Sequence, residues 1–215
     1  DNYDFALKNY PLINSRVQIT RIEVWITNRQ NRVNTSPEGN NLRNIIAIQD
    51  LGAAQLTGLA DNEVVVLNPS TGIFNNPANS PSDNTNNDYD PGQIAAGTGL
   101  LNSNIREIAT SSSGFNTTVV EGRDYSKLEN ARKLTANEYT FNSKLGFISL
   151  QQRLSNDEVL AVAYQYTIGD QVYQVGEFGN DGVDATNVVG GNNNVPQAII
   201  TQSLILKMLI IPCLR

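Results

Sequence analysis

Histidine is absent from the 215-residue chain, and cysteine, methionine and tryptophan each occur once. Without histidine the chain cannot form Ser-His-Asp or Cys-His catalytic arrangements, an imidazole general base or a His-ligated metal site. Cys213 has no second cysteine, which excludes an intramolecular disulfide and a structural zinc site. A Walker-type phosphate loop is also missing, because Gly97-Thr98-Gly99 lacks a third glycine and a preceding strand.

Clustered positive charge is lacking as well. Lysine plus arginine total 15 against 21 aspartate plus glutamate, a net charge of −6 without long blocks of one sign. Nucleic acids and anionic membrane surfaces both require grouped cations. The sequence therefore predicts no nucleic-acid partner and an acidic surface. The first residues, Asp1-Asn2-Tyr3-Asp4, do not resemble a signal peptide; if the protein is exported, we expect its signal outside this sequence.

The chain also lacks the run of ~20 apolar residues that a membrane-spanning helix needs. Its most apolar segment, Ala198–Leu214, is interrupted by polar residues and a proline. Within it, Ser203–Pro212 is long enough for a membrane-spanning strand. The absence of clean polar alternation favours a strand buried on both faces instead. Both interpretations stay open on this evidence.

The strongest positive signal is an alternation of apolar and polar residues between Asn137 and Phe178. A two-residue period is typical of strands and incompatible with one face of a helix. The expected strands are Glu138–Asn142, Gly146–Gln151, Asp157–Ile168 and Gln171–Val175. Gly169-Asp170 suits a two-residue hairpin turn, because glycine at its first position accepts a positive φ. The sequence therefore predicts an antiparallel meander here.

A further strand is expected at Arg16–Thr27. Its alternation changes phase at Thr20-Arg21, which predicts a β-bulge. Trp25 faces away from its apolar neighbours, and it can either anchor a binding face or pack beneath a covering loop.

The rest of the chain is less regular. Asn44–Gln49 and Glu63–Leu67 are candidate strands, whereas Leu100–Ala109 and Lys127–Leu134 could each be helix or strand. Polar loops are expected at Asn28–Asn44, at residues 68–99, which we predict to be long and flexible, and at Gly179–Pro196. Together these elements predict an all-β fold: a single antiparallel β-sandwich-like domain over residues 1–215, with long polar loops and little helix.

One loop contains a candidate calcium site. Oxygen-bearing side chains alternate at Asn84, Asn86, Asp88 and Asp90, and Ca²⁺ takes 6–8 oxygen ligands. The loop lacks the central glycine and distal glutamate of an EF-hand, and an asparagine-rich solvated loop is the simpler interpretation. Asp181 and Asp184 form a weaker candidate for the same kind of calcium loop. The carboxylate pairs Asp157-Glu158 and Asp181/Asp184 are conceivable for glycoside hydrolysis, but neighbouring acids at turns are usually solvated, so catalysis is not expected. Apart from the candidate calcium, no cofactor is expected.

A family resemblance rests on long, ordered stretches. They are YPLINSRVQITRIEVWITNR (Tyr10–Arg29), ARKLTANEYTFNSKLGFISLQQRLSNDEVLAVAYQYT (Ala131–Thr167), VYQVGEF (Val172–Phe178) and LILKML (Leu204–Leu209). These stretches resemble the SprA/Sov family, the outer-membrane translocon of the type IX secretion system, which also supports gliding motility. Members of that family are much longer, so the resemblance implies that this chain is a fragment.

The resemblance implies a location in the cell outer membrane, at the cell surface or the periplasmic face. It also implies partners among the other secretion-apparatus subunits and the secreted client proteins. Because the sequence shows no reactive centre, we expect a non-enzymatic structural domain. From the acidic surface and the lack of a complete lipid-facing band, we expect it to be a soluble inserted or capping domain of the membrane-embedded parent. The alternative is a carbohydrate-binding or adhesive cell-surface β-sandwich, with Trp25 and Tyr89 as contact aromatics.

Overall fold

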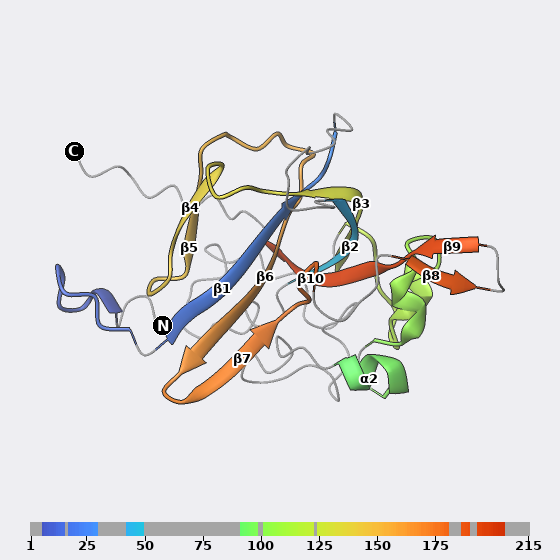
Figure 1. Cartoon of the computed structure of the whole chain (residues 1–215), viewed down its shortest axis with the longest axis horizontal. Helices are drawn as coiled ribbons and strands as arrows, with labels where there is room; N and C mark the ends of the chain where they lie inside the picture. Colours follow the sequence, from blue (N-terminus) through green and yellow to red (C-terminus); the bar gives the residue numbers. More distant parts are fainter. Residues whose placement is uncertain are drawn as a thin grey trace.

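The structure is a computed structural model, and it describes residues 6–15, 17–29, 42–49, 91–98, 101–122, 124–180, 186–189 and 193–204. Strands dominate these residues, and the helical segments are short (Figure 1). The predicted all-β class with little helix is therefore confirmed.

Six strands form the main sheet. They are β1 (Val17–Ile26), β2 (Leu42–Gln49), β3 (Tyr125–Lys133), β6 (Leu160–Ile168), β7 (Gln171–Val175) and β10 (Ala198–Leu204). The neighbour order is β1-β3-β2-β10-β6-β7, and β1 also pairs with β6. Five strands, β1, β3, β2, β10 and β6, therefore close into a ring. The sixth strand, β7, pairs with the part of β6 that extends beyond the end of β10. All pairs are antiparallel except β2 with β10, which is parallel.

The register of the long β1–β6 pair confirms two predictions. The pairing shifts between Ile19 and Arg21, which places the β-bulge where the phase of the alternation changes. At the far end of β6, Ile168 pairs with Gln171 across the predicted two-residue turn. Gly169 has a φ of +60° there, a conformation that side chains with a Cβ rarely adopt.

The interior of the ring is filled by one cluster to which all five strands contribute. Its members are Trp25, Ile45, Ala47, Leu128, Ala131, Ala161 and Ile199. One large indole and three alanines share this space, which fits the narrow interior of a sheet that closes with few strands. Burial of these apolar groups is the main stabilising contribution at the centre of the molecule.

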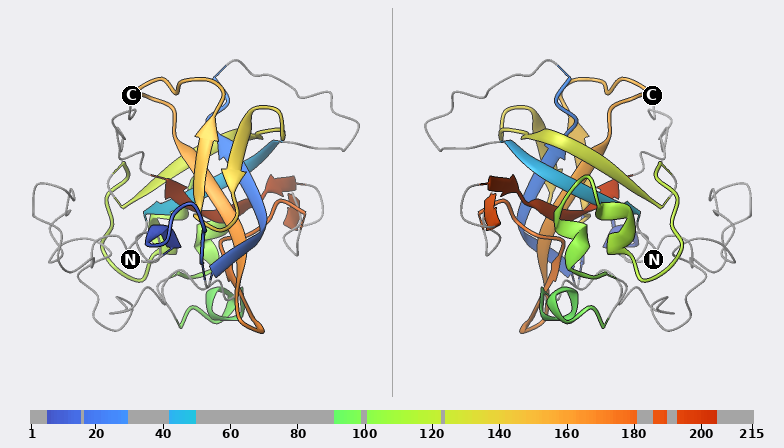
Figure 2. Two further views of the ribbon diagram at one scale, coloured as in Figure 1. Left: turned by 90° about the vertical axis from the view of Figure 1, so that its left-hand side faces the viewer. Right: turned by 90° about the vertical axis from the view of Figure 1, so that its right-hand side faces the viewer.

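Two outer faces of the ring are covered by different layers. The hairpin β4 (Tyr139–Asn142) and β5 (Phe147–Leu150) packs against β1 and β6. The helical segments α2 (Pro91–Ala96), η4 (Ser103–Arg106) and η5 (Ser111–Gly114) cover β2 and β10. Figure 2 shows the hairpin toward the viewer in its left view and the 3-10 segments in its right view. Packing of the small β4–β5 sheet on the main sheet gives the expected sandwich-like layering.

The structure decides several assignments that the sequence left open or assigned differently. Lys127–Leu134 is strand β3 rather than helix, and Leu100–Ala109 contains η4. Gly179–Pro196, predicted as a loop, contains the hairpin β8 (Thr186–Val189) with β9 (Asn193–Pro196). Pro91–Ala96, within the predicted 68–99 loop, is helical.

Other predictions fall outside the described residues. These are the strand at Glu63–Leu67, the loop at residues 68–90 and most of Ser203–Pro212.

Candidate functional site

Glu23 is a buried carboxylate on the same face of β1 as Trp25. Its side chain is 4 % exposed, and Oε1 accepts a hydrogen bond of 2.6 Å from Lys133 Nζ. Arg21 lies 3.7 Å from the same oxygen. Oε2 accepts a 2.8 Å hydrogen bond from the backbone N–H of Gly179. Both carboxylate oxygens are therefore occupied by contacts within the fold.

The residues that follow β7 cover this carboxylate and the indole beside it. Arg43 Nη1 donates to the Gly179 carbonyl at 2.8 Å, and the Arg21 guanidinium lies 3.8 Å from the Phe178 ring centroid. A Cβ added at Gly179 would lie 2.8 Å from Trp25 Cζ2, which is closer than packed carbons approach. Trp25 is 1 % exposed, so it packs beneath a covering segment and does not present a binding face.

Glu177 forms a second buried ion pair on the same segment. It is 1 % exposed, and Oε2 accepts hydrogen bonds from Arg106 Nη1 at 2.5 Å and from Ile200 N at 2.7 Å. The Glu177 backbone N–H donates to the Ile200 carbonyl at 2.7 Å. Glu177 thus forms hydrogen bonds with the backbone N–H and carbonyl of Ile200 in β10, just after β7 ends. Its ion pair with Arg106 connects η4 to the sheet. We refer to Glu177, Phe178 and Gly179 as the 177–179 segment.

Sequence reasoning did not single out these charges, although a signal was present. Glu23 occupies a position whose neighbours two residues away include Trp25, so strand parity places it on the inner face. Buried carboxylates require paired cations and hydrogen bonds. The hydrogen-bonded partner cations, Lys133 and Arg106, come from β3 and η4, and only the tertiary structure brings them to these carboxylates.

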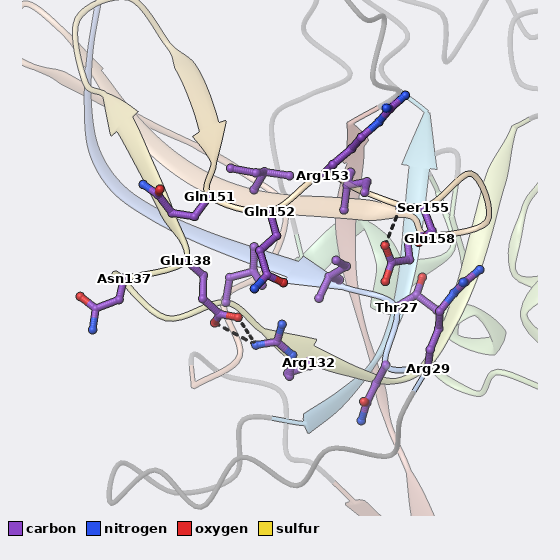
Figure 3. A pocket seen from close by; sticks show the side chains of 15 residues that line it. Thr27, Arg29, Arg132, Asn137, Glu138, Gln151, Gln152, Arg153, Ser155 and Glu158 are labelled. Carbon is purple, nitrogen blue, oxygen red and sulfur yellow. Dashed lines mark hydrogen bonds and ion pairs between the residues drawn. The ribbon is translucent and has the colours of Figure 1, made fainter.

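A polar cleft of about 360 Å³ lies where β1 ends, and Thr27 and Arg29 are among the side chains that line it (Figure 3). Its apolar lining consists of Ile26, Leu134, Leu150 and Leu154. Its polar lining consists of Thr27, Asn28, Arg29, Arg132, Asn137, Glu138, Gln151, Gln152, Arg153, Ser155 and Glu158. This combination of polar and apolar side chains can form hydrogen bonds and apolar contacts with a ligand, but it does not identify the ligand.

The two carboxylates of the cleft are engaged by neighbouring donors. Glu138 pairs with Arg132 at 2.8 Å and accepts from the Thr135 backbone N–H at 2.8 Å. Burial raises the pKa of Glu138, but the hydrogen bonds from Thr135 and Arg132 outweigh it and hold the pKa below its ordinary value. Glu158 accepts from Ser155 N at 2.7 Å. Glu138 is therefore ionised near neutral pH and does not supply a proton.

The carboxylate pair singled out from the sequence is divided in the structure. Asp157 forms an ion pair with Arg29, whereas Glu158 accepts the hydrogen bond within the turn. Within the described residues, no three side chains of the histidine, cysteine, aspartate and glutamate types gather as a metal site would require. Asn84, Asn86, Asp88 and Asp90 lie outside those residues, as do Asp181 and Asp184. The calcium loop therefore stays a prediction.

The comparison with protein families decides the broad assignment. The model of the SprA_N family, whose description is motility related/secretion protein, matches residues 1–166. This chain belongs to the SprA_N family. The match runs from the start of the chain almost to the end of β6, and it confirms the resemblance found in the sequence. No curated protein matches the chain. None of the helices in the described ranges has the length and apolar character needed to cross a membrane.

Proposed function

We propose that this SprA_N-family chain is a non-enzymatic structural domain of an outer-membrane translocon that supports type IX protein secretion and gliding motility. The observation that carries the proposal is the family match over residues 1–166, whose description joins motility and secretion. The proposed location is the cell outer membrane, at its surface or periplasmic face. The proposed partners are other secretion-apparatus subunits and secreted client proteins.

The way in which the chain uses its buried charges supports a scaffolding role. Glu23 and Glu177 are almost fully buried, and both hold backbone groups of distant segments in place. A buried ion pair adds little net stability, but breaking it is costly, so it fixes one arrangement of its partners. The 177–179 segment is therefore held rigidly against the ring. Rigid placement is the property that a structural domain of a large assembly requires.

The experiment that tests this proposal alters the domain inside the parent protein. Deletion of the segment corresponding to residues 17–204 should abolish client secretion and surface spreading in a host that depends on the system. Glu129→Ala, on the exposed side of β3, is the matched control and should leave both unchanged. Immunoblotting must show that the deleted parent still accumulates. Normal secretion and spreading by the deletion strain would refute the proposal.

We also propose that the chain is one β-rich domain that folds without lipid. Purification of the 215-residue chain as a single monodisperse species without detergent would support this. A requirement for detergent throughout purification would contradict it.

The adhesive or carbohydrate-binding alternative loses one of its two contact aromatics. Trp25 lies beneath Gly179 and is 1 % exposed, so it cannot stack on a sugar ring. Tyr89 lies outside the described residues. Glycan-array binding that Tyr89→Ala abolishes would revive this alternative.

A further inference from the structure

Strand β7 is the last strand of the main sheet, and its outer edge has no partner strand among the described residues. Ile168 and Gln171 close a two-residue hairpin, and such closing pairs are hydrogen-bonded. Hydrogen-bonded and non-bonded pairs then alternate, so Tyr173 bonds to β6, whereas Val172 and Gln174 direct their backbone N–H and C=O groups outward. The edge therefore offers two donors and two acceptors in the spacing of a strand.

The β6–β7 hairpin carries little charge. Between Leu160 and Gly176, Asp170 in the turn is the only charged residue, in a chain in which 17 % of residues are charged. Exposed edge strands are normally protected from pairing by lysine, proline or a bulge. β7, with the sequence QVYQV, has none of these.

The open edge of β3 provides a contrast within the same sheet. On the side away from β2, β3 pairs with β1 only at Arg132 and Lys133, and its first residue, Tyr125, is bridged to Glu121. Among the described residues, the part of this edge between them, residues 126–131, has no strand partner. That strand carries Lys127 and Glu129, and Asn130 adopts a positive φ that interrupts its regular course. Among the described residues, the open part of the β3 edge therefore carries the usual protection against pairing, and the β7 edge does not.

Exposed apolar side chains surround the unprotected edge. Val172 is 59 % exposed and Ile168 is 42 % exposed at the hairpin end. The rings of Tyr166 and Tyr173 stack with centroids 5.1 Å apart, and both are only partly buried. The turn reaches the lower end of the coloured ribbon in both views of Figure 2. Tyrosine enrichment and charge depletion are the composition of the centre of a protein interface.

We propose that the outer edge of β7 binds an extended, uncharged polypeptide segment of a partner protein, which adds to the sheet as a further strand. Backbone groups of Val172 and Gln174 supply the hydrogen bonds, and the tyrosine stack contacts the apolar side chains of the added strand. The occupant must be extended, because only a strand matches the donor and acceptor spacing. It must also carry no charge at these positions, because β7 presents no charge to pair with it. This inference stands independently of the secretion role.

The test selects peptides on the purified 215-residue chain from a library of random displayed octapeptides. We expect the selected sequences to alternate apolar and polar residues and to be poor in charge and proline. Val172→Lys should weaken their binding about tenfold or more, because the edge lysine opposes strand addition. Thr140→Lys, on the exposed face of β4, introduces the same charge and should leave binding unchanged.

Amide hydrogen exchange identifies the contact directly. A selected peptide should slow exchange at Val172 and Gln174, whereas Tyr173, already bonded to β6, should change little. The proposal is overturned if no peptide is enriched or if Val172→Lys and Thr140→Lys bind equally well. It is also overturned if sedimentation shows a dimer of the chain that Val172→Lys dissociates, because the occupant would then be a second copy.

Discussion

Two neighbouring parts of the chain use charge in opposite ways. The β6–β7 hairpin has one charged residue, in its turn, and exposes Ile168 and Val172. The 177–179 segment follows at once. It is held by the ion pair of Glu177 with Arg106 and by the hydrogen bond from the Gly179 N–H to Glu23, and both carboxylates are almost fully buried. Buried charge fixes one arrangement of the backbone. An uncharged exposed edge leaves its backbone groups open to a partner. The comparison separates the anchored part of the molecule from the part suited to binding.

The largest effect is expected for Glu177→Ala. The substitution removes the buried carboxylate that Arg106 and the Ile200 N–H share, which should cost about 3 kcal/mol of unfolding free energy. Chemical denaturation measures this directly. Glu129→Ala, an exposed glutamate in β3, is the control and should change stability by less than about 0.5 kcal/mol. Similar losses in both variants would show that the buried pair does not anchor the segment.

Gly179→Ala should destabilise the protein by about 2 kcal/mol, because the added methyl group overlaps the buried indole. Combination with Trp25→Phe removes the ring atoms that it meets. The double mutant should lose about 1 kcal/mol less unfolding free energy than the sum of the losses in the two single mutants. Additive costs, measured by the same denaturation experiment, would mean that Gly179 is not packed on Trp25.

The Arg132–Glu138 pair provides a partly exposed ion pair for comparison with Glu177. Glu138→Gln should cost less than about 1 kcal/mol at neutral pH, because solvent screens the pair. The folded-state pKa of Glu138 is lowered, so its contribution is complete above the ordinary value near 4.5 and is lost as pH falls through the folded-state pKa. The stability difference between variant and wild type should therefore shrink in acid. A difference that is constant with pH would contradict this assignment.

The smallest effect is expected for Val172→Lys. The side chain is 59 % exposed and packs on little, so stability should stay within about 0.5 kcal/mol of the wild type. Thermal unfolding measures this. A large loss of stability would show that Val172 is part of the core and would remove the contrast between the hairpin and the 177–179 segment.

Much of the strand pattern followed from the sequence alone. The bulge at Thr20-Arg21 and the Gly169-Asp170 turn were predicted because both leave local marks: a change of phase and a residue that tolerates positive φ. Lys127–Leu134 could not be assigned in this way, because its helical propensity competes with pairing to β2, which lies far away in sequence. The hairpin in Gly179–Pro196 was missed because its glycine and asparagine content resembles a loop.

The sequence by itself determined the strand class, the family and the absence of histidine chemistry, since these depend on composition, period and ordered similarity. Only the tertiary structure decided that β10 runs parallel to β2 and closes the ring. It alone brought Lys133 and Gly179 to Glu23, and Arg106 to Glu177. The physical reason is that alternation specifies which face a residue occupies. The partner across that face is chosen by packing and charge between segments distant in sequence.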